Sequence, residues 1–382
     1  MNRVLAGCVT LAFAAAASCL AADARSVAVD AKEVAIAEVV KLLTAQGAPT
    51  VTVHPDDLAG QKVTFAAKAM PSASALRWLC RSQNLVVFEG KDNRLVLARP
   101  DAEPVTEKEY NVVKLLVAET TADAIVAFTK KVIFVAHPMR SKGDDGTLRP
   151  VLDAVVEKGK LKVAGTAMVQ REVLAFLRAI SKVQPKRAME DIRVPYHPYE
   201  IGFLGSGNAA TGPKLVGEVT LDVAGVSPAE AAWALTSAAK VSFYVDPWDS
   251  GLNGVKVSLK AENRPVAEVA KEFATQLGAE RTWHDEAWLF VREDRRPLFD
   301  GFIVRAYNIA GVGGIRRSFL RAVREGVKGV QQIAQKDMPF SIEHADDLVL
   351  ISGPADWHAG AEDFVKKGPD IERFIPRGKK FR

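Results

Sequence analysis

The stretch Val27-Ala28-Val29-Asp30 returns near the middle of the chain, 192 residues later, as Val219-Thr220-Leu221-Asp222. Further landmarks repeat at offsets of 192 to 194 residues, up to residue 97 of the first copy. They are His54-Pro55 with Asp246-Pro247, Met70-Pro71 with Arg264-Pro265, and Leu95-Val96-Leu97 with Leu289-Phe290-Val291. A register kept over this length indicates a duplicated unit, so the chain is expected to be an array of small modules.

The two copies of this unit, A (residues 25–100) and A′ (215–294), have the pattern β-α-β-β-α-β. In A the opening strand is expected to be short, and a helix follows Ala31. A second helix opens at Pro71, because proline is tolerated in the first helical turn, and a hairpin from Val86 to Leu97 closes the unit. The expected helical core residues are Ile36, Val39, Val40, Leu43, Leu76, Leu79 and Cys80 in A, and Ala231, Ala232, Leu235, Val266, Val269, Ala270 and Phe273 in A′.

A second unit, with the pattern β-α-β-β-α, also occurs twice. Tyr110-Asn111-Val112 matches Tyr307-Asn308-Ile309, and residues 161–165 match residues 349–353. The predicted fold class is therefore α+β, a tandem array of modules in the order A-B-A′-B′. Its expected parts are a signal peptide (1–22), A (25–100), B (106–184), a linker (185–214), A′ (215–294), B′ (300–369) and a basic tail (370–382).

The composition is that of a folded protein, since 48% of the 382 residues are hydrophobic and 25% are charged, with a net charge of +5. Arg3, the apolar run from Val9 to Ala17 and the small residues after it are typical of an export signal. No later apolar run approaches the ~20 residues that a membrane span needs. The basic tail is interpreted as a solvated terminus rather than an anchor for membranes or nucleic acids.

Cysteine usage gives two further expectations. Cys19 follows Ala16-Ala17-Ser18, where a lipoprotein cysteine would stand, although the usual large aliphatic residue three positions earlier is missing. Lipidation at Cys19 therefore stays open. Cleavage after Cys19 would leave Cys80 alone, so no internal disulfide could form, and its apolar helical setting predicts a buried thiol rather than a nucleophile.

Unit A resembles the short N-terminal domain of secretins and TonB-dependent transducers, and unit B resembles the secretin N-terminal repeat that follows it. The marks in A are the opening strand ending at Asp30 or Asp222, the strand end at Val53-His54-Pro55 or Val245-Asp246-Pro247, and the proline before the second helix. The marks in B are the Tyr-Asn strand and a strand ending at Gly165 or Gly353. The sequence lacks the β repeats of the barrels in which those proteins continue, so the resemblance implies a stand-alone set of modules.

In that family these modules are not enzymes but form rings or docking surfaces. The resemblance thus implies a non-enzymatic scaffold without a cofactor, in the periplasm or at the outer membrane. Its partners would be inner-membrane or outer-membrane secretion components, and a homo-oligomer stays open. The candidate partner-binding residues lie on a basic helix of B′ and in the aromatic, proline-rich linker, which is expected to lie along a neighbouring module: Arg316, Arg317, Arg321, Tyr196, Tyr199 and Phe203.

Motifs with possible chemistry are interpreted as structural. The six histidines are scattered without ligand spacing, so no metal or catalytic site is predicted. His284-Asp285-Glu286 is expected to be a solvated hairpin turn. Residues 205–210 spell a relaxed dinucleotide fingerprint but stand in the linker, outside a βαβ unit. Residues 246–254 lack the last glutamate of a calcium loop and are expected to form a turn.

Two other functions stay open. The first is an exported ligand binder or enzyme with its site at a junction between modules, which would need converging polar groups. The second is nucleic-acid binding, because Gly311-Val312-Gly313-Gly314 before Arg316, Arg317, Arg321 and Arg324 is similar to the loop of a KH module. The export signal and the place of these glycines, ahead of the first helix of the unit, both argue against nucleic acid.

Overall fold

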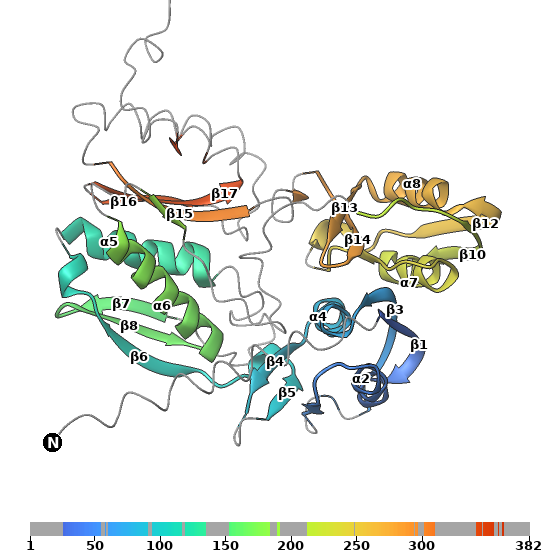
Figure 1. Cartoon of the computed structure of the whole chain (residues 1–382), viewed down its shortest axis with the longest axis horizontal. Helices are drawn as coiled ribbons and strands as arrows, with labels where there is room; N and C mark the ends of the chain where they lie inside the picture. The colour runs from blue at the N-terminus through green and yellow to red at the C-terminus, as the bar shows by residue number, and fades with distance from the viewer. Residues whose placement is uncertain are drawn as a thin grey trace, which may run out of the picture. The chain divides into compact units, whose positions relative to one another are not determined.

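The structure is a computed structural model. It describes residues 26–54, 58, 60–90, 94–116, 119–134, 153–183, 189–191, 212–247, 249–293, 295–296, 302–309, 341–345, 347–354, 358 and 361–362. Small sheets alternate with helices along this part of the chain, which confirms the predicted α+β class (Figure 1). None of its described helices is both long and apolar enough to cross a membrane.

Modules A and A′ have the same order of elements and the same two sheets. In A these elements are β1 (Ser26–Ala35), α2 (Ile36–Ala45), β2 (Val51–Val53), β3 (Lys62–Pro71), α4 (Ser72–Gln83), β4 (Val86–Glu89) and β5 (Leu95–Ala98). In A′ they are β10 (Glu218–Val226), α7 (Pro228–Ala238), β11 (Phe243–Val245), β12 (Val257–Pro265), α8 (Val266–Leu277), β13 (Glu280–His284) and β14 (Ala287–Val291). The sheet orders are β1-β3 and β2-β5-β4 in A, and β10-β12 and β11-β14-β13 in A′.

The predicted closing hairpin is present, and counting both of its strands gives the order β-α-β-β-α-β-β, one strand more than the pattern named above. The prediction of a short opening strand in A was wrong, because β1 continues through a bulge after Ala31 and α2 begins only at Ile36. Glu33 lies in this bulge with a positive φ of 54°, a backbone conformation that bulges often use.

Backbone conformations that L-residues rarely adopt repeat at matching positions of the two copies. Positive φ angles occur at Glu33 and Gly225 (54° and 63°), Ala69 and Asn263 (53° and 50°), and Asn84 and Gly278 (52° and 59°). The first two pairs interrupt the ladders of β1 with β3 and of β10 with β12, and the third pair ends α4 and α8. Such positions are uncommon in general, so their coincidence shows that the two modules share their backbone design.

The helices of A and A′ bury the apolar residues that their spacing predicts. Helix α2 buries Ile36, Val39, Val40 and Leu43, and α8 buries Val266, Val269, Ala270 and Phe273. Pro228 stands at the first position of α7, where proline is tolerated, behind the capping residue Ser227. Cys80 is fully buried in α4, which confirms the interpretation of a buried thiol.

Modules B and B′ also share a sheet order. Module B consists of β6 (Thr106–Asn111), α5 (Glu119–Phe128) running into a π-helical turn (Thr129–Phe134), β7 (Asp153–Glu157), β8 (Lys160–Gly165) and α6 (Ala167–Lys182). The strands described in B′ are β15 (Phe302–Asn308), β16 (Ser341–Ala345) and β17 (Leu348–Pro354). The orders are β6-β8-β7 and β16-β17-β15, with antiparallel pairs throughout. One bond repeats as well: Val112 N–H donates to Gly159 O (3.0 Å) as Ile309 N–H does to Asp347 O (2.8 Å).

Part of the predicted linker forms a strand. Residues Met189–Asp191 (β9) pair antiparallel with β15 on the side opposite β17, so that the sheet of B′ has four strands in the order β16-β17-β15-β9. Asp191 lies across from Arg305 and Glu190 across from Ala306. The linker therefore supplies an extended segment that completes the edge of a module.

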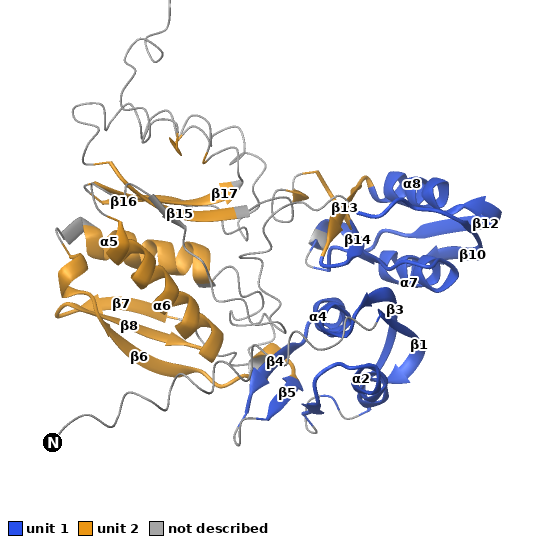
Figure 2. Cartoon of the chain, in the orientation of Figure 1, with its two compact units in different colours: residues 1–97, 212–277, 285–289 blue, residues 98–211, 278–284, 290–382 orange. Residues whose placement is uncertain are grey.

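The chain divides into two compact units (Figure 2). Unit 1 comprises residues 1–97, 212–277 and 285–289, and so brings A together with most of A′. Unit 2 comprises residues 98–211, 278–284 and 290–382, and brings B together with B′. Each unit is thus assembled mainly from the two copies of one kind of module.

Candidate functional site

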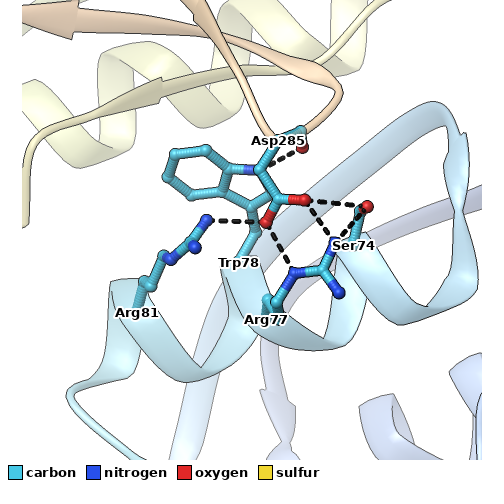
Figure 3. Close-up of polar contacts among 5 residues, drawn as sticks. All are labelled: Ser74, Arg77, Trp78, Arg81 and Asp285. Carbon is cyan, nitrogen blue, oxygen red and sulfur yellow. Dashed lines mark hydrogen bonds and ion pairs between the residues drawn. The ribbon is translucent and has the colours of Figure 1, made fainter. Parts of the chain in front are cut away.

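The main polar feature of unit 1 is centred on Asp285, at the turn between β13 and β14. Asp285 and Glu286 both have positive φ angles, 47° and 63°, as in the two-residue turns that suit a twisted hairpin. The Asp285 side chain is only 9% exposed, because the turn projects onto helix α4 of module A (Figure 3). The prediction of a solvated turn was therefore wrong for Asp285.

The Asp285 carboxylate accepts hydrogen bonds from three side chains of α4 (Figure 3). Arg77 donates from Nε to Oδ2 at 2.8 Å and from Nη2 to Oδ1, a bidentate pairing. Arg81 donates from Nη1 to Oδ2 at 2.7 Å, and Ser74 donates from Oγ to Oδ1 at 3.0 Å. Bidentate, charge-assisted bonds of this kind fix geometry as well as contribute energy. We call Ser74, Arg77, Trp78, Arg81 and Asp285 the clasp.

Helix geometry explains why α4 can hold the clasp. Ser74, Arg77, Trp78 and Arg81 are spaced at i, i+3, i+4 and i+7, so they lie on one face. Trp78 completes this face by donating from Nε1 to the Asp285 backbone oxygen at 2.9 Å. The other face supplies the core of module A through Ala75, Leu76, Leu79 and Cys80, all buried. Helix α4 is thus covered on both faces.

The clasp places two guanidinium groups around one carboxylate. The side chains of Arg77 and Arg81 are 10% and 5% exposed, so solvent screens this interaction little. Burial raises the pKa of the nearby Cys80 thiol to about 12. The positive charges of Arg81 and Arg77 act in the opposite direction but are the smaller influence on this pKa. The thiol stays protonated at neutral pH and is unsuited to nucleophilic chemistry.

Strand β3 makes a second set of contacts with A′. Ser242 Oγ accepts from Lys68 N–H at 2.7 Å and donates to Lys68 O at 2.9 Å. Tyr244 donates from its hydroxyl to Ala66 O at 2.8 Å, and its ring stacks on Trp78 with centroids 4.3 Å apart. Burial raises the pKa of the Tyr244 hydroxyl, so it remains a donor through the neutral range. Side chains of A′ therefore form hydrogen bonds with backbone groups along the outer edge of β3.

An exposed rim surrounds these buried contacts. Asp30 accepts hydrogen bonds from Trp233 Nε1 at 3.2 Å and from Ser237 Oγ at 3.0 Å. The ammonium group of Lys32 lies 5.1 Å from the centre of the Trp233 ring, within the range of a cation–π interaction. A desolvated centre that contains aromatic and arginine side chains, surrounded by a wetter polar rim, is the usual anatomy of a specific protein interface.

A cavity of about 310 Å³ opens beside this contact. Its walls come from β3, the end of α4, the start of α7, β11 and the turn that follows β11. Phe65, Trp233 and Tyr244 give it aromatic surface, and Asp246, Asp249 and Lys256 add charged groups. The described residues among 246–254, which leave out residue 248, form turns as predicted together with a short 3-10 helix (Ser250–Leu252), and Asp249 accepts from Gly251 N–H at 2.9 Å.

The residues predicted to bind partners fall in parts of the chain that the structure does not describe. Arg316, Arg317 and Arg321, the linker aromatics Tyr196, Tyr199 and Phe203, and Cys19 all lie outside the described residues. So do Gly205 to Ala210 and Gly311 to Gly314. In the part of the chain that is described, no three His, Cys, Asp or Glu side chains gather as a metal site would require.

The clasp was not predicted from the sequence. Its residues on α4 could have been recognised, since Arg77, Trp78 and Arg81 share the face opposite the apolar stripe. A tryptophan is unusual on a helix face that is exposed to solvent. Asp285 could not have been recognised in this way, because an aspartate in a polar turn has the sequence pattern of an exposed loop.

Comparisons with known proteins add no identification. No protein-family model matches this chain, and no curated protein matches it.

Proposed function

We propose that this chain is an exported, non-enzymatic protein-interaction scaffold made of secretin-type periplasmic modules. The single observation that supports it best is the contact of A with A′. There one module binds another through a helix face and a hairpin turn that neither needs for its own core. Modules of this kind thus have surfaces suited to holding folded proteins.

Three further features support the proposal. The first residues have the pattern of an export signal. Strand β9 shows that a module sheet of this chain takes up an extended segment at its edge. The charged groups of the clasp are bonded to one another, an arrangement that positions two modules. We place the protein in the periplasm, as part of or accessory to a secretion, pilus or envelope assembly.

The test is crosslinking in the native cells, followed by purification of the tagged full-length chain from periplasmic and envelope fractions. The expected result is a stoichiometric envelope protein in the crosslinked complex. The matched control is the same tag on an unrelated exported protein. Recovery of the chain as a free monomer, with the same background as the control, would contradict the proposal.

The cavity beside the contact of A with A′ favours one alternative, an exported binder of a small ligand. Its volume of about 310 Å³ lies at the lower end of the range for ligand sites, and its lining mixes aromatic and charged groups as such sites do. Native mass spectrometry of protein purified from cells tests this idea. A bound compound of defined mass would favour the binder, and the mass of the bare chain alone would count against it.

A further inference from the structure

Strand β6 lies at one edge of its sheet. The corresponding strand of B′, β15, pairs with an additional strand, β9. The order β6-β8-β7 matches the order β15-β17-β16, and β9 pairs with the outer side of β15. In the described part of the chain no strand pairs with the outer side of β6.

The backbone register makes this likeness specific. Val112 N–H donates to Gly159 O, toward β8, just as Ile309 N–H donates to Asp347 O, toward β17. Because backbone groups alternate along a strand, Glu107, Glu109 and Asn111 direct their N–H and C=O groups away from β8. Ala306 and Asn308 are the corresponding residues of β15, and Ala306 pairs with Glu190 of β9. Glu109 therefore matches the position that β9 uses.

The side chains of the β6 edge are charged and exposed. Glu107 lies across from Ala164, and Glu109 lies across from Lys162, so both glutamates share the sheet face that carries Lys160 and Lys162. Lys160 Nζ is 2.5 Å from Glu109 Oε2. Lys108 points to the opposite face and is also exposed. A strand added here would meet the charges −, +, − in succession.

This pattern disfavours copies of the same chain. An antiparallel pair of two β6 strands centred on Lys108 would set Glu107 against Glu109 and Lys108 against Lys108. Strand β9 of a second copy, placed as β9 lies on β15, would set Glu190 against Glu109. Like charges directly opposite one another destabilise a strand pair, and charged edge strands are a known protection against self-association.

We propose that the β6 edge binds an extended segment of a partner protein with the mirrored charges basic, acidic, basic at three consecutive residues. Basic side chains would lie beside Glu107 and Glu109, and the acidic one beside Lys108. The backbone groups of Glu107 and Glu109 supply the affinity common to all added strands, and the charges select among them. This inference rests on the proposed scaffold function, for which it names a surface and a class of partner.

The test uses the full-length chain and two synthetic peptides of equal length, with the centres Thr-Val-Lys-Glu-Lys-Val-Thr and Thr-Val-Glu-Lys-Glu-Val-Thr. Amide hydrogen exchange is followed as each peptide is added. We expect the first peptide to protect the amides of Glu107 and Glu109, and to bind about 5- to 10-fold more tightly than the second. Equal protection by both peptides, or none from either, would overturn the inference.

Two variants separate backbone recognition from charge. Glu109→Pro removes an N–H that faces away from β8, a place where edge strands accept proline, and should abolish binding of the first peptide. Glu107→Lys with Glu109→Lys keeps both N–H groups and should reverse the peptide preference. An unchanged preference in this double variant would contradict the role of charge. Retained binding by Glu109→Pro, with β6–β8 exchange unaltered, would contradict the strand pairing.

The same variants distinguish this inference from the scaffold proposal in cells. If Glu109→Pro still captures the crosslinked partner of the wild type, the β6 site is wrong and the scaffold proposal stands. If no partner is found but the peptide preference holds, the edge binds as described and the scaffold proposal loses its support.

Discussion

Helices α4 and α8 occupy the same place in modules A and A′ but have different surroundings. Both bury an apolar stripe in their own module. Helix α4 also buries Arg77, Trp78 and Arg81 against A′. At the matching positions, 194 residues on, α8 has Lys271, Glu272 and Thr275, of which Lys271 and Thr275 are exposed and Glu272 is half-buried.

The difference shows how a duplicated module can become a partner for its own copy. The two copies share the backbone and the apolar stripe, whereas the second face is buried in α4 and largely solvated in α8. The partner turn changed as well, since the counterpart of Asp285 in the first copy is Lys91. With the copies exchanged, the turn would offer Lys91 in place of the carboxylate and the helix would offer only one basic side chain, Lys271, in place of two. The bidentate pairing could not form, so the polar residues define which copy supplies the helix and which the turn.

Neutralising Asp285 should have the largest effect on this arrangement. Asp285→Asn keeps the shape and suits the positive φ, but leaves two buried guanidinium groups without a counter-charge. Removal of one member of a buried ionic group costs about 3–5 kcal/mol. Native-state hydrogen exchange at the α4 amides measures this loss. Glu286→Gln, at the exposed neighbouring turn position, should change exchange by less than about 0.5 kcal/mol, and an equal effect of both variants would refute the clasp.

The paired variants Arg77→Met and Lys271→Met compare the two helices directly. Arg77→Met removes the bidentate partner but leaves Arg81 and Ser74 on Asp285, so we expect a loss of about 1.5–3 kcal/mol. Lys271→Met alters the exposed twin and should cost less than about 0.5 kcal/mol. Urea unfolding followed at the amides of both helices gives the two values. Similar values for both variants would show that α4 and α8 do not differ in energetic role.

The core stripes of these helices could be predicted because helical spacing is a local property of the sequence. Ile36, Val39 and Val40 needed no knowledge of the rest of the chain. The length of β1 could not be predicted from local spacing, since the strand continues past Ala31 only through the bulge at Glu33. Such a bulge is stabilised by the partner strand, which lies some thirty residues further along the sequence.

The clasp depends on contacts that are still more distant in sequence. Ser74 and Asp285 are 211 residues apart, and nothing local to Asp285 distinguishes it from a solvated turn residue. The duplication itself was visible, but which copies would pack together was not, because pairing depends on the surfaces that remain after each core is formed. The sequence offered a hint at the matching position of the two helices, where α4 has Trp78 and α8 has Glu272. This difference indicates that the outer face of α4 is covered and that of α8 is not.

Loss of the Ser242 hydroxyl should have an intermediate effect. Ser242→Ala removes the partner of both the N–H and the C=O of Lys68, at a residue that is 1% exposed. A buried backbone group without its partner costs about 1–3 kcal/mol, and we expect the lower part of this range because Tyr244 still bonds Ala66. The exchange rate of the Lys68 amide reports the change. Ser237→Ala, on the exposed rim, serves as control and should leave that rate nearly unchanged.

The smallest effect is expected where the first helices of the two copies differ. Helix α7 begins with a capping box, in which Ser227 and Glu230 bond each other's backbone N–H groups, whereas α2 begins at Ala35 without a side-chain cap. Ser227→Ala should lower the stability of α7 by about 0.5–1 kcal/mol. Ala35→Ser should add a side-chain cap to α2 and stabilise it by a part of that amount. Amide exchange in the first turns of α7 and α2 measures both changes.

The Ser227 N–H and hydroxyl also lower the pKa of the Glu230 carboxyl below 4.5. Because the pKa is lower in the folded than in the unfolded chain, this stabilisation is present above pH 4.5 and is lost as the pH falls through the folded value. The stability of the α7 amides should therefore decline in acid more steeply in the wild type than in Glu230→Gln, which keeps an acceptor for Ser227 but does not titrate. Parallel pH profiles for the two proteins would contradict an ionised Glu230 in the cap, and with it this difference between α7 and α2.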